Sequence, residues 1–242
     1  MNTLQILLTG GMKGEPLPYL LRTDWVVTSL LFLCIFSFCY FMSKEKKHLQ
    51  IQFRSLFTTR ERASLFDDAT GTDLRHTIGL ILHSCTLLGV CIYYYFSQTA
   101  PEVLHQGGHL TLLGSFIGLS VVYLITKWGV YQFVNWLFFE KNKNSSWTNT
   151  FFNVVVYLGI FLLPVVLLVV YFDLSPENSL YSMAAILILA KILLFWNCFN
   201  NFFNKIHGFF HLILYFCALE ILPDLILWKG LIISTNKLIL NI

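Results

Sequence analysis

Two formal charges lie inside otherwise apolar stretches of the C-terminal third of the chain. Lys191 lies within the run Leu180–Phe199, and Glu220 lies within the run Phe209–Lys229. If these runs form antiparallel helices, each charge lies roughly 16 Å from the start of its helix, near the midplane of a ~30 Å hydrocarbon core. An isolated charge at that depth costs at least ~2.5–3.5 kcal/mol on insertion scales. The sequence therefore predicts that Lys191 and Glu220 form an ion pair facing the interior of a helical bundle.

This pair has a possible extension one helical turn further along the chain. Asp224 follows Glu220 by four residues, and Pro223 between them has no N–H to donate, so we expect a helix kink there. Titratable groups in a row could relay a proton or bind a transported ion or substrate. The alternative is a structural pair that fixes the register of two helices. With a single pair the structural interpretation is the simpler one, because a relay needs a chain of titratable groups leading to water.

The histidines offer a second possible chemistry. A haem site needs two axial imidazoles at matched depth on facing helices. By helix rise, His83 lies roughly 9 Å from the edge of its span and His211 only about 3 Å from the edge of its own, which disfavours haem. A single His207-x-x-x-His211 motif is also too little for a metal-dependent lipid hydroxylase. We instead predict a polar cytoplasmic rim without a metal or cofactor, made of His83, His207, His211, Asn197 and Asn200.

The composition is that of a membrane protein. Of the 242 residues, 56% are hydrophobic and only 12% are charged, and apolar runs of about 20 residues recur along the chain. The predicted fold is all-α, a polytopic membrane helical bundle in one integral membrane domain, residues 1–242, with interfacial amphipathic helices. The six predicted transmembrane helices are 25–42, 77–96, 109–126, 150–171, 180–199 and 209–229.

Three segments have features suited to packing or to the membrane surface. The basic stretch 43–76 contains Leu49, Phe53, Leu56 and Phe57 at helical spacing, which indicates an amphipathic helix continuing from the first span. Residues 127–140 are aromatic and amphipathic, and form either an interfacial helix or an extension of the third span. Within that span, Gly114 and Gly118 form a GxxxG pattern, which predicts a flat strip for close helix packing.

The distribution of basic residues predicts the orientation. Segments 43–76, 127–149 and 200–208 together contain eleven Lys and Arg residues, whereas the opposite side has four. By the positive-inside rule the first group is cytoplasmic, which places both termini in the periplasm. The net charge of +3 is small and does not indicate binding to nucleic acid.

Several segments together resemble a known family. They are Arg22-Thr-Asp24-Trp25, the stretch from Gln50-Ile-Gln52-Phe53 to Thr59-Arg60-Glu61-Arg62, and Leu214-Tyr-Phe-Cys-Ala-Leu-Glu220-Ile-Leu-Pro223. They are similar to an uncharacterised polytopic inner-membrane protein family of Bacteroidota, a domain of unknown function with an LYxCxLExxP-like C-terminal span. The resemblance implies a bacterial inner-membrane location and no particular activity.

The sequence contains no phosphate-binding loop, nucleophile elbow or other catalytic pattern, so an enzymatic role is not indicated. We expect a non-enzymatic inner-membrane subunit or scaffold, with the lipid bilayer and other membrane subunits as partners, and protein export or insertion as the process it could serve. The first alternative is a small proton-coupled transporter using Lys191, Glu220 and Asp224. The second is a histidine-dependent membrane enzyme acting on haem or lipid.

Overall fold

The computed structural model describes residues 21–57, 71–99, 108–138, 141–172, 174–202 and 214–240. These residues are almost entirely helical and include no strand, which confirms the all-α prediction. The elements are η1 (Leu21–Thr23), α2 (Trp25–Phe57), α3 (Gly71–Thr99), α5 (His109–Phe138), α6 (Lys141–Tyr171), α7 (Pro176–Phe202), the π-helical turn η3 (Cys217–Ile221) and α9 (Leu222–Leu240).

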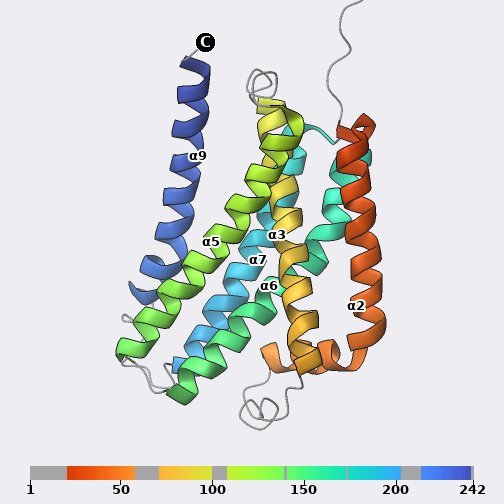
Figure 1. Ribbon diagram of the computed structural model, residues 1–242. Coiled ribbons are helices and arrows are strands. Elements are labelled where there is room, and N and C mark those ends of the chain that lie inside the picture. The colour runs from red at the N-terminus through yellow and green to blue at the C-terminus, as the bar shows by residue number, and fades with distance from the viewer. Residues whose placement is uncertain are drawn as a thin grey trace, which may run out of the picture.

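The helices form an elongated bundle with the dimensions of a membrane domain. Five of the described helices, α2, α3, α5, α6 and α7, are long and apolar enough to cross a bilayer. The C-terminal helix α9 lies beside α5, on the side of the bundle away from α2, and ends at the same end of the bundle at which α2 begins (Figure 1). The protein is therefore a polytopic membrane protein, as predicted.

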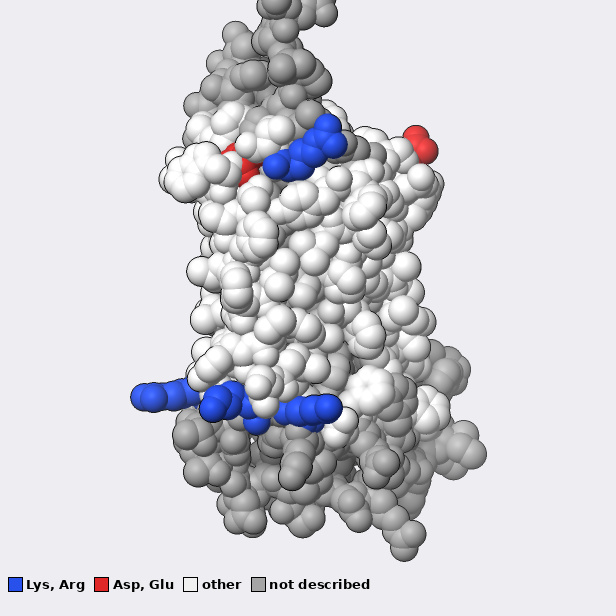
Figure 2. Space-filling model, turned by 90° about the vertical axis from the view of Figure 1, so that its right-hand side faces the viewer, with Lys and Arg blue, Asp and Glu red and all other residues white. Residues whose placement is uncertain are grey.

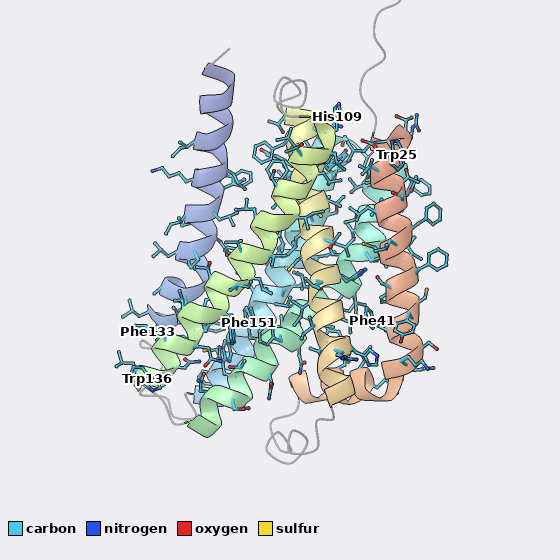
Figure 3. The ribbon with its side chains drawn as sticks, in the orientation of Figure 1. Trp25, Phe41, His109, Phe133, Trp136 and Phe151 are labelled. Atoms are coloured by element: carbon cyan, nitrogen blue, oxygen red, sulfur yellow. The ribbon has the colours of Figure 1, made fainter. Side chains whose placement is uncertain are left out.

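The surface shows the polarity expected for such a bundle. Basic side chains gather at the end where α2 meets α3, and a broad band without charged residues separates them from the opposite end (Figure 2). Aromatic side chains mark the two ends, with Trp25 at one and Phe133 and Trp136 at the other (Figure 3). Tryptophan at the borders of an apolar band is typical of the membrane–water interface.

Helices α3 and α6 form the centre of the bundle and are the most buried of the five apolar helices. Helix α3 packs on α5 and α6, and α6 also packs on α7. The two larger core clusters lie mainly between α2, α3 and α6 and between α5, α6, α7 and the residues around η3, and a smaller one contains Leu49, Leu80 and Val156. The second cluster surrounds the charged residues described below.

Helix α2 continues past the predicted span and turns across the end of the bundle (Figure 1). Leu49 is buried there, and its carbonyl accepts a hydrogen bond from the Tyr157 hydroxyl at 2.5 Å. The Phe53 ring meets the Tyr157 ring edge-on, with centroids 5.2 Å apart. The amphipathic helix predicted after the first span is therefore present up to Phe57. The side chains of Leu56 and Phe57 and all of residues 58–70 lie outside the described part of the chain.

Residues 127–138 extend the third span, so the first of the two alternatives, a separate interfacial helix, was wrong. Helix α5 is continuous to Phe138 because its polar residues find partners within the bundle. The Gln132 amide donates to the Thr148 hydroxyl of α6 at 2.7 Å, and Asn135 is fully buried. Lys127, counted above with the cytoplasmic basic residues, therefore lies inside a transmembrane helix.

Gly114 and Gly118 have no close neighbour among the described residues, so the packing role predicted for them stays a prediction. A methyl group added at either glycine would meet no atom within 4 Å, because this face of α5 points away from the other described helices. Close approach occurs elsewhere. A Cβ at Gly89 would lie 2.7 Å from the Cα of Ile117, and one at Gly159 would lie 3.0 Å from the Cα of Ser84. Helix α3 therefore packs closely on α5 at Gly89 and on α6 at Gly159.

Candidate functional site

A single carboxylate, that of Glu220, lies at the centre of the polar site. Its side chain is fully buried, with 0% exposed. One carboxylate oxygen, Oε2, accepts hydrogen bonds from the Nζ atoms of both Lys127 and Lys191, and the other, Oε1, accepts one from the Tyr131 hydroxyl. A buried charge needs this degree of pairing, because an ion loses several kcal/mol of hydration free energy when it leaves water.

Asp224 extends this arrangement toward a cavity. Its carboxylate lies 2.7 Å from the Nζ atom of Lys191 and 3.7 Å from that of Lys127, and it accepts a hydrogen bond from the Tyr123 hydroxyl. Two lysines and two carboxylates give the cluster a formal charge of zero. The side chains of Lys191 and Asp224 are 28% and 40% exposed, so this half of the cluster is open to whatever fills the cavity.

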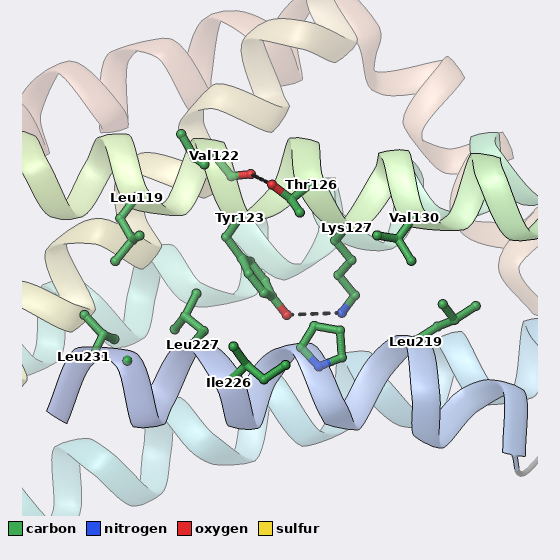
Figure 4. Close-up of a pocket in the computed structure, with 12 residues that line it drawn as sticks. Leu119, Val122, Tyr123, Thr126, Lys127, Val130, Leu219, Ile226, Leu227 and Leu231 are labelled. Carbon is green, nitrogen blue, oxygen red and sulfur yellow. Dashed lines mark hydrogen bonds between the residues drawn. The ribbon is translucent and has the colours of Figure 1, made fainter. Parts of the chain in front are cut away.

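Helix α5 supplies its part of the site through residues spaced four apart. Tyr123, Lys127, Tyr131 and Asn135 lie on one helix face, since residues i and i+4 are neighbours on a helix surface. Figure 4 shows Tyr123 and Lys127 extending from α5 toward the C-terminal helix, with the lysine donating to the tyrosine oxygen at 3.5 Å. This polar stripe faces Glu220 and Asp224, and so explains why α5 can carry a lysine deep in its span.

The other wall is shaped by the π-helical turn η3. Its Cys217 carbonyl accepts from the N–H of Leu222, five residues on, instead of the usual four. Pro223 follows directly, and a proline ring both removes a donor and clashes with the carbonyl four residues earlier, here that of Leu219. A wider turn relieves that clash, and single π turns inside helices occur frequently at functional sites. The kink predicted at Pro223 stays a prediction, and the wider turn that precedes this proline contains Glu220.

A second polar network adjoins the first at the end where α5 meets α6. Tyr215 donates to Asn135 at 2.5 Å, and its ring lies beside that of Tyr131, with centroids 6.1 Å apart. From there hydrogen bonds lead from Asn135 to Asn144 at 3.2 Å and from Asn144 to Gln132 at 2.6 Å. The last two side chains are only partly buried. This network lies beside Tyr131, which donates to the buried Glu220, and extends to the partly buried Gln132 and Asn144.

The structure brings together three of the residues predicted for the site, namely Lys191, Glu220 and Asp224. It adds Lys127 and Tyr131, which sequence reasoning missed. Lys127 was counted with the cytoplasmic basic residues because it begins a segment whose aromatic, amphipathic pattern predicts either an interfacial helix or an extension of the third span. The four-residue spacing of polar side chains along α5 was the signal that could have placed it.

Of the five residues predicted to form a polar rim, the structure describes the side chains of two, His83 and Asn197, and both are buried. His83 is buried against Phe38, with ring centroids 6.2 Å apart, and among the described residues neither ring nitrogen has a hydrogen-bond partner. Asn197 is also fully buried and donates to the Leu193 carbonyl of its own helix at 2.8 Å. Both side chains point into the bundle because the helices that carry them pack on that face. His207, His211 and the side chain of Asn200 lie outside the described residues.

Two cavities meet at the cluster. One, of about 550 Å³, lies between α5 and the C-terminal helix and is shown in Figure 4. The other, of about 340 Å³, lies deeper between α3, α5, α6, α7 and α9. Tyr123, Lys127, Leu227 and Leu231 line both. Apart from the charged cluster the walls are almost entirely apolar.

The fold and the site define a polytopic membrane protein with a neutral cluster of four charged residues inside its helical bundle. The family described as "Domain of unknown function (DUF4271)" matches residues 27–231, which include every residue of the charged cluster. The chain belongs to this family. Neither the comparison with curated proteins nor that with solved structures gives a match.

Proposed function

We propose that this protein is a proton-coupled membrane transporter in which Glu220 is the group that takes up and releases the proton. One observation carries the proposal. A fully buried carboxylate contacts two lysines and a tyrosine and lies between a polar network on one side and an open cavity on the other. Intramembrane ionisable groups arranged in this way are typical of proton pathways.

The cluster contains more titratable groups than a lone ion pair, because Lys127, Tyr131 and Asp224 accompany Lys191 and Glu220. From Gln132 through Asn144, Asn135 and Tyr215, side chains that can donate and accept hydrogen bonds lead toward Glu220. On the far side Lys191 links Glu220 to Asp224 at the cavity. We propose that protons reach Glu220 from the end of the bundle where α5 meets α6, past Tyr215 and Tyr131, and leave it toward the cavity.

Proton uptake changes the charge of the whole cluster. With Glu220 ionised the two lysines and two carboxylates sum to zero, and with Glu220 protonated the sum becomes +1. A low-dielectric interior makes an uncompensated charge costly. The protonated cluster therefore favours either release of the proton toward the cavity or entry of a compensating anion, which couples proton movement to transport.

We further propose that the protein resides in a bacterial inner membrane with both termini in the periplasm. The support is the concentration of Lys and Arg at the end where α2 meets α3, because basic residues favour the cytoplasmic side. The polar network at the α5–α6 end would then face the cytoplasm. The role as a subunit or scaffold, expected from the sequence, stays a prediction, and the charged cluster favours transport over it.

Infrared spectroscopy of the purified protein tests whether Glu220 takes up a proton. Difference spectra between high and low pH should contain a carboxylic acid C=O stretching band that disappears in Glu220→Gln. Glu177→Gln is the matched control, because Glu177 lies exposed in the first turn of α7, away from the cluster. Its spectrum should keep the band. A band of equal size in wild type and Glu220→Gln would rule out Glu220 as the proton carrier.

A further inference from the structure

The deeper cavity has the shape and chemistry of a binding site for an amphipathic molecule. Its volume of about 340 Å³ falls within the range of small-molecule sites. Most of its walls are aliphatic or aromatic, including Leu88, Phe96, Leu124, Ala184, Leu187 and Trp228. One end is polar and consists of Tyr123, Lys127, Lys191 and Asp224. A ligand that fits therefore has a long apolar part and one polar end group.

The lysines stand between Glu220 and this cavity. Lys127 and Lys191 line the cavity and also donate to Glu220, whereas Glu220 itself does not line it. Each lysine ammonium has three N–H donors, so it can contact a ligand in front while facing Glu220 behind. The ligand end group and the proton site are thus on opposite sides of the same two cations.

Charge balance indicates the sign of the end group. Once Glu220 is protonated the cluster has a charge of +1, and a single anionic group in the cavity restores neutrality. Asp224 also faces the cavity, but its carboxylate is already paired with Lys191 and Tyr123. A cationic end group would instead meet two lysines. A carboxylate has a single negative charge, which balances the +1 charge of the protonated cluster. It also accepts strong hydrogen bonds from ammonium groups.

The second cavity supplies a route from the bilayer. The described residues that line it belong to α5, η3 and α9, and four of them also line the deeper cavity. A molecule dissolved in the membrane can therefore reach the cluster sideways, between α5 and α9. Figure 4 shows that Tyr123 and Lys127 lie on this route.

We propose that the deeper cavity binds a long-chain carboxylate, with its chain among the apolar walls and its head group on Lys127 and Lys191, and that protonation of Glu220 strengthens binding. This inference rests on the proposed function, since it names the substrate class. The charged and titratable groups that face Glu220 are Tyr123, Lys127 and Tyr131 of α5, Lys191 and Cys198 of α7, and Tyr215 and Asp224 on the C-terminal segment.

Fluorescence quenching of Trp228 measures the binding directly, because this tryptophan lines the cavity. Bromine-substituted hexadecanoic acid should quench the full-length protein saturably, and Trp228→Phe should lose that quenching. The probes with the same brominated chain but an alcohol or a quaternary ammonium end should bind at least about tenfold more weakly, a factor that corresponds to one modest charge interaction. Equal quenching by all three probes would overturn the proposal.

Two neighbouring alanines give a matched pair of variants. Ala184 lines the cavity, whereas Ala185 is exposed on the outside of α7 and does not. Ala184→Phe should weaken binding of the brominated acid by about tenfold or more, which corresponds to about 1.4 kcal/mol. Ala185→Phe should leave it unchanged. Equal affinities in the two variants would place the acid outside the cavity.

The effect of the proton separates this inference from the proposed function. Glu220→Gln mimics the protonated carboxyl, so it should bind the acid about tenfold more tightly at high pH and lose the pH dependence of wild type. If the infrared band shows that Glu220 titrates while the brominated acid binds no more tightly than the alcohol and ammonium probes, the proposed substrate class is wrong. In that case the proposal that Glu220 carries the proton is unaffected. If the acid binds equally at every pH, in wild type and in Glu220→Gln, the proposed link between protonation and binding is wrong.

Discussion

Three hydrogen-bond donors converge on the Glu220 carboxylate, and two of them are lysines that also lie near Asp224. Removing the carboxylate therefore leaves positive charge inside the membrane domain. Lys127 is the more sensitive of the two lysines, because its side chain is only 6% exposed and Asp224 is 3.7 Å away. Lys191 would still have an anionic partner without Glu220, because its Nζ atom lies 2.7 Å from the Asp224 carboxylate.

The two lysines are therefore expected to differ in a double-mutant cycle with Glu220. Glu220→Gln alone should lower the free energy of unfolding by about 3–5 kcal/mol, because it breaks a buried ion pair and strands a charge. Adding Lys127→Met should recover much of that loss, and adding Lys191→Met should recover less. Denaturant unfolding in detergent measures wild type, the single variants and the two double variants. Purely additive effects would show that these residues do not interact.

His83 offers a prediction of the opposite sign. A buried polar group without a hydrogen-bond partner costs about 1–3 kcal/mol, and an apolar side chain of similar size avoids that cost. His83→Leu should therefore raise the free energy of unfolding by about 1 kcal/mol. His109→Leu is the control and should lower it, because the His109 Nδ1 lies 3.3 Å from the Tyr93 hydroxyl. A loss of stability in His83→Leu would show that the imidazole has a partner beyond the described residues.

At the scale of single helices, hydropathy identified the spans that contain Lys191 and Glu220 but did not place Lys127 inside a span. The apolar runs around Lys191 and Glu220 are long and otherwise almost free of charge, so hydropathy alone assigns both residues to spans. The run that contains Lys127 is followed by the polar residues Gln132 and Asn135, which lower its apparent hydrophobicity. Only the partners on α6 and on the C-terminal segment explain why that part of α5 stays inside the bundle. Such partners cannot be read from local composition.

The same limit applies to the glycines. A GxxxG pattern shows that a helix face is flat, but tertiary packing decides whether another helix lies against that face. In this chain the tight contacts involve Gly89 and Gly159 instead. Both are single glycines without a motif around them, so the sequence contained no signal for their role.

Alanine substitutions distinguish the two kinds of glycine. Gly89→Ala should lower the free energy of unfolding by about 1–3 kcal/mol, because the new methyl group collides with the Ile117 backbone. Gly114→Ala and Gly118→Ala should be neutral or stabilising by up to about 1 kcal/mol, since alanine is the better helix former. Thermal unfolding of the three variants checks this. A clear loss of stability or of complex yield in Gly114→Ala would support the packing role predicted for that face, with a partner outside this chain.

At the scale of the whole molecule, the alternation of the helices predicts which segments are reached from each side. Single cysteines introduced into a cysteine-free background at residues 60, 105, 145 and 176 should be labelled alternately from the cytoplasm and the periplasm, beginning with the cytoplasm. A membrane-impermeant thiol reagent on intact cells distinguishes the two sides. Labelling of residue 105 from the cytoplasm would contradict both the topology and the proposed direction of the proton path.

The central claim is that protons cross this bundle by way of Glu220, and proton flux in proteoliposomes tests it most directly. The vesicles contain a pH-sensitive dye, and a potassium diffusion potential drives protons inward. Wild type and Glu177→Gln should acidify the lumen faster than protein-free vesicles, whereas Glu220→Gln, reconstituted at equal density, should not. Equal rates in wild type and Glu220→Gln would contradict the account, whether both exceed the protein-free rate or neither does.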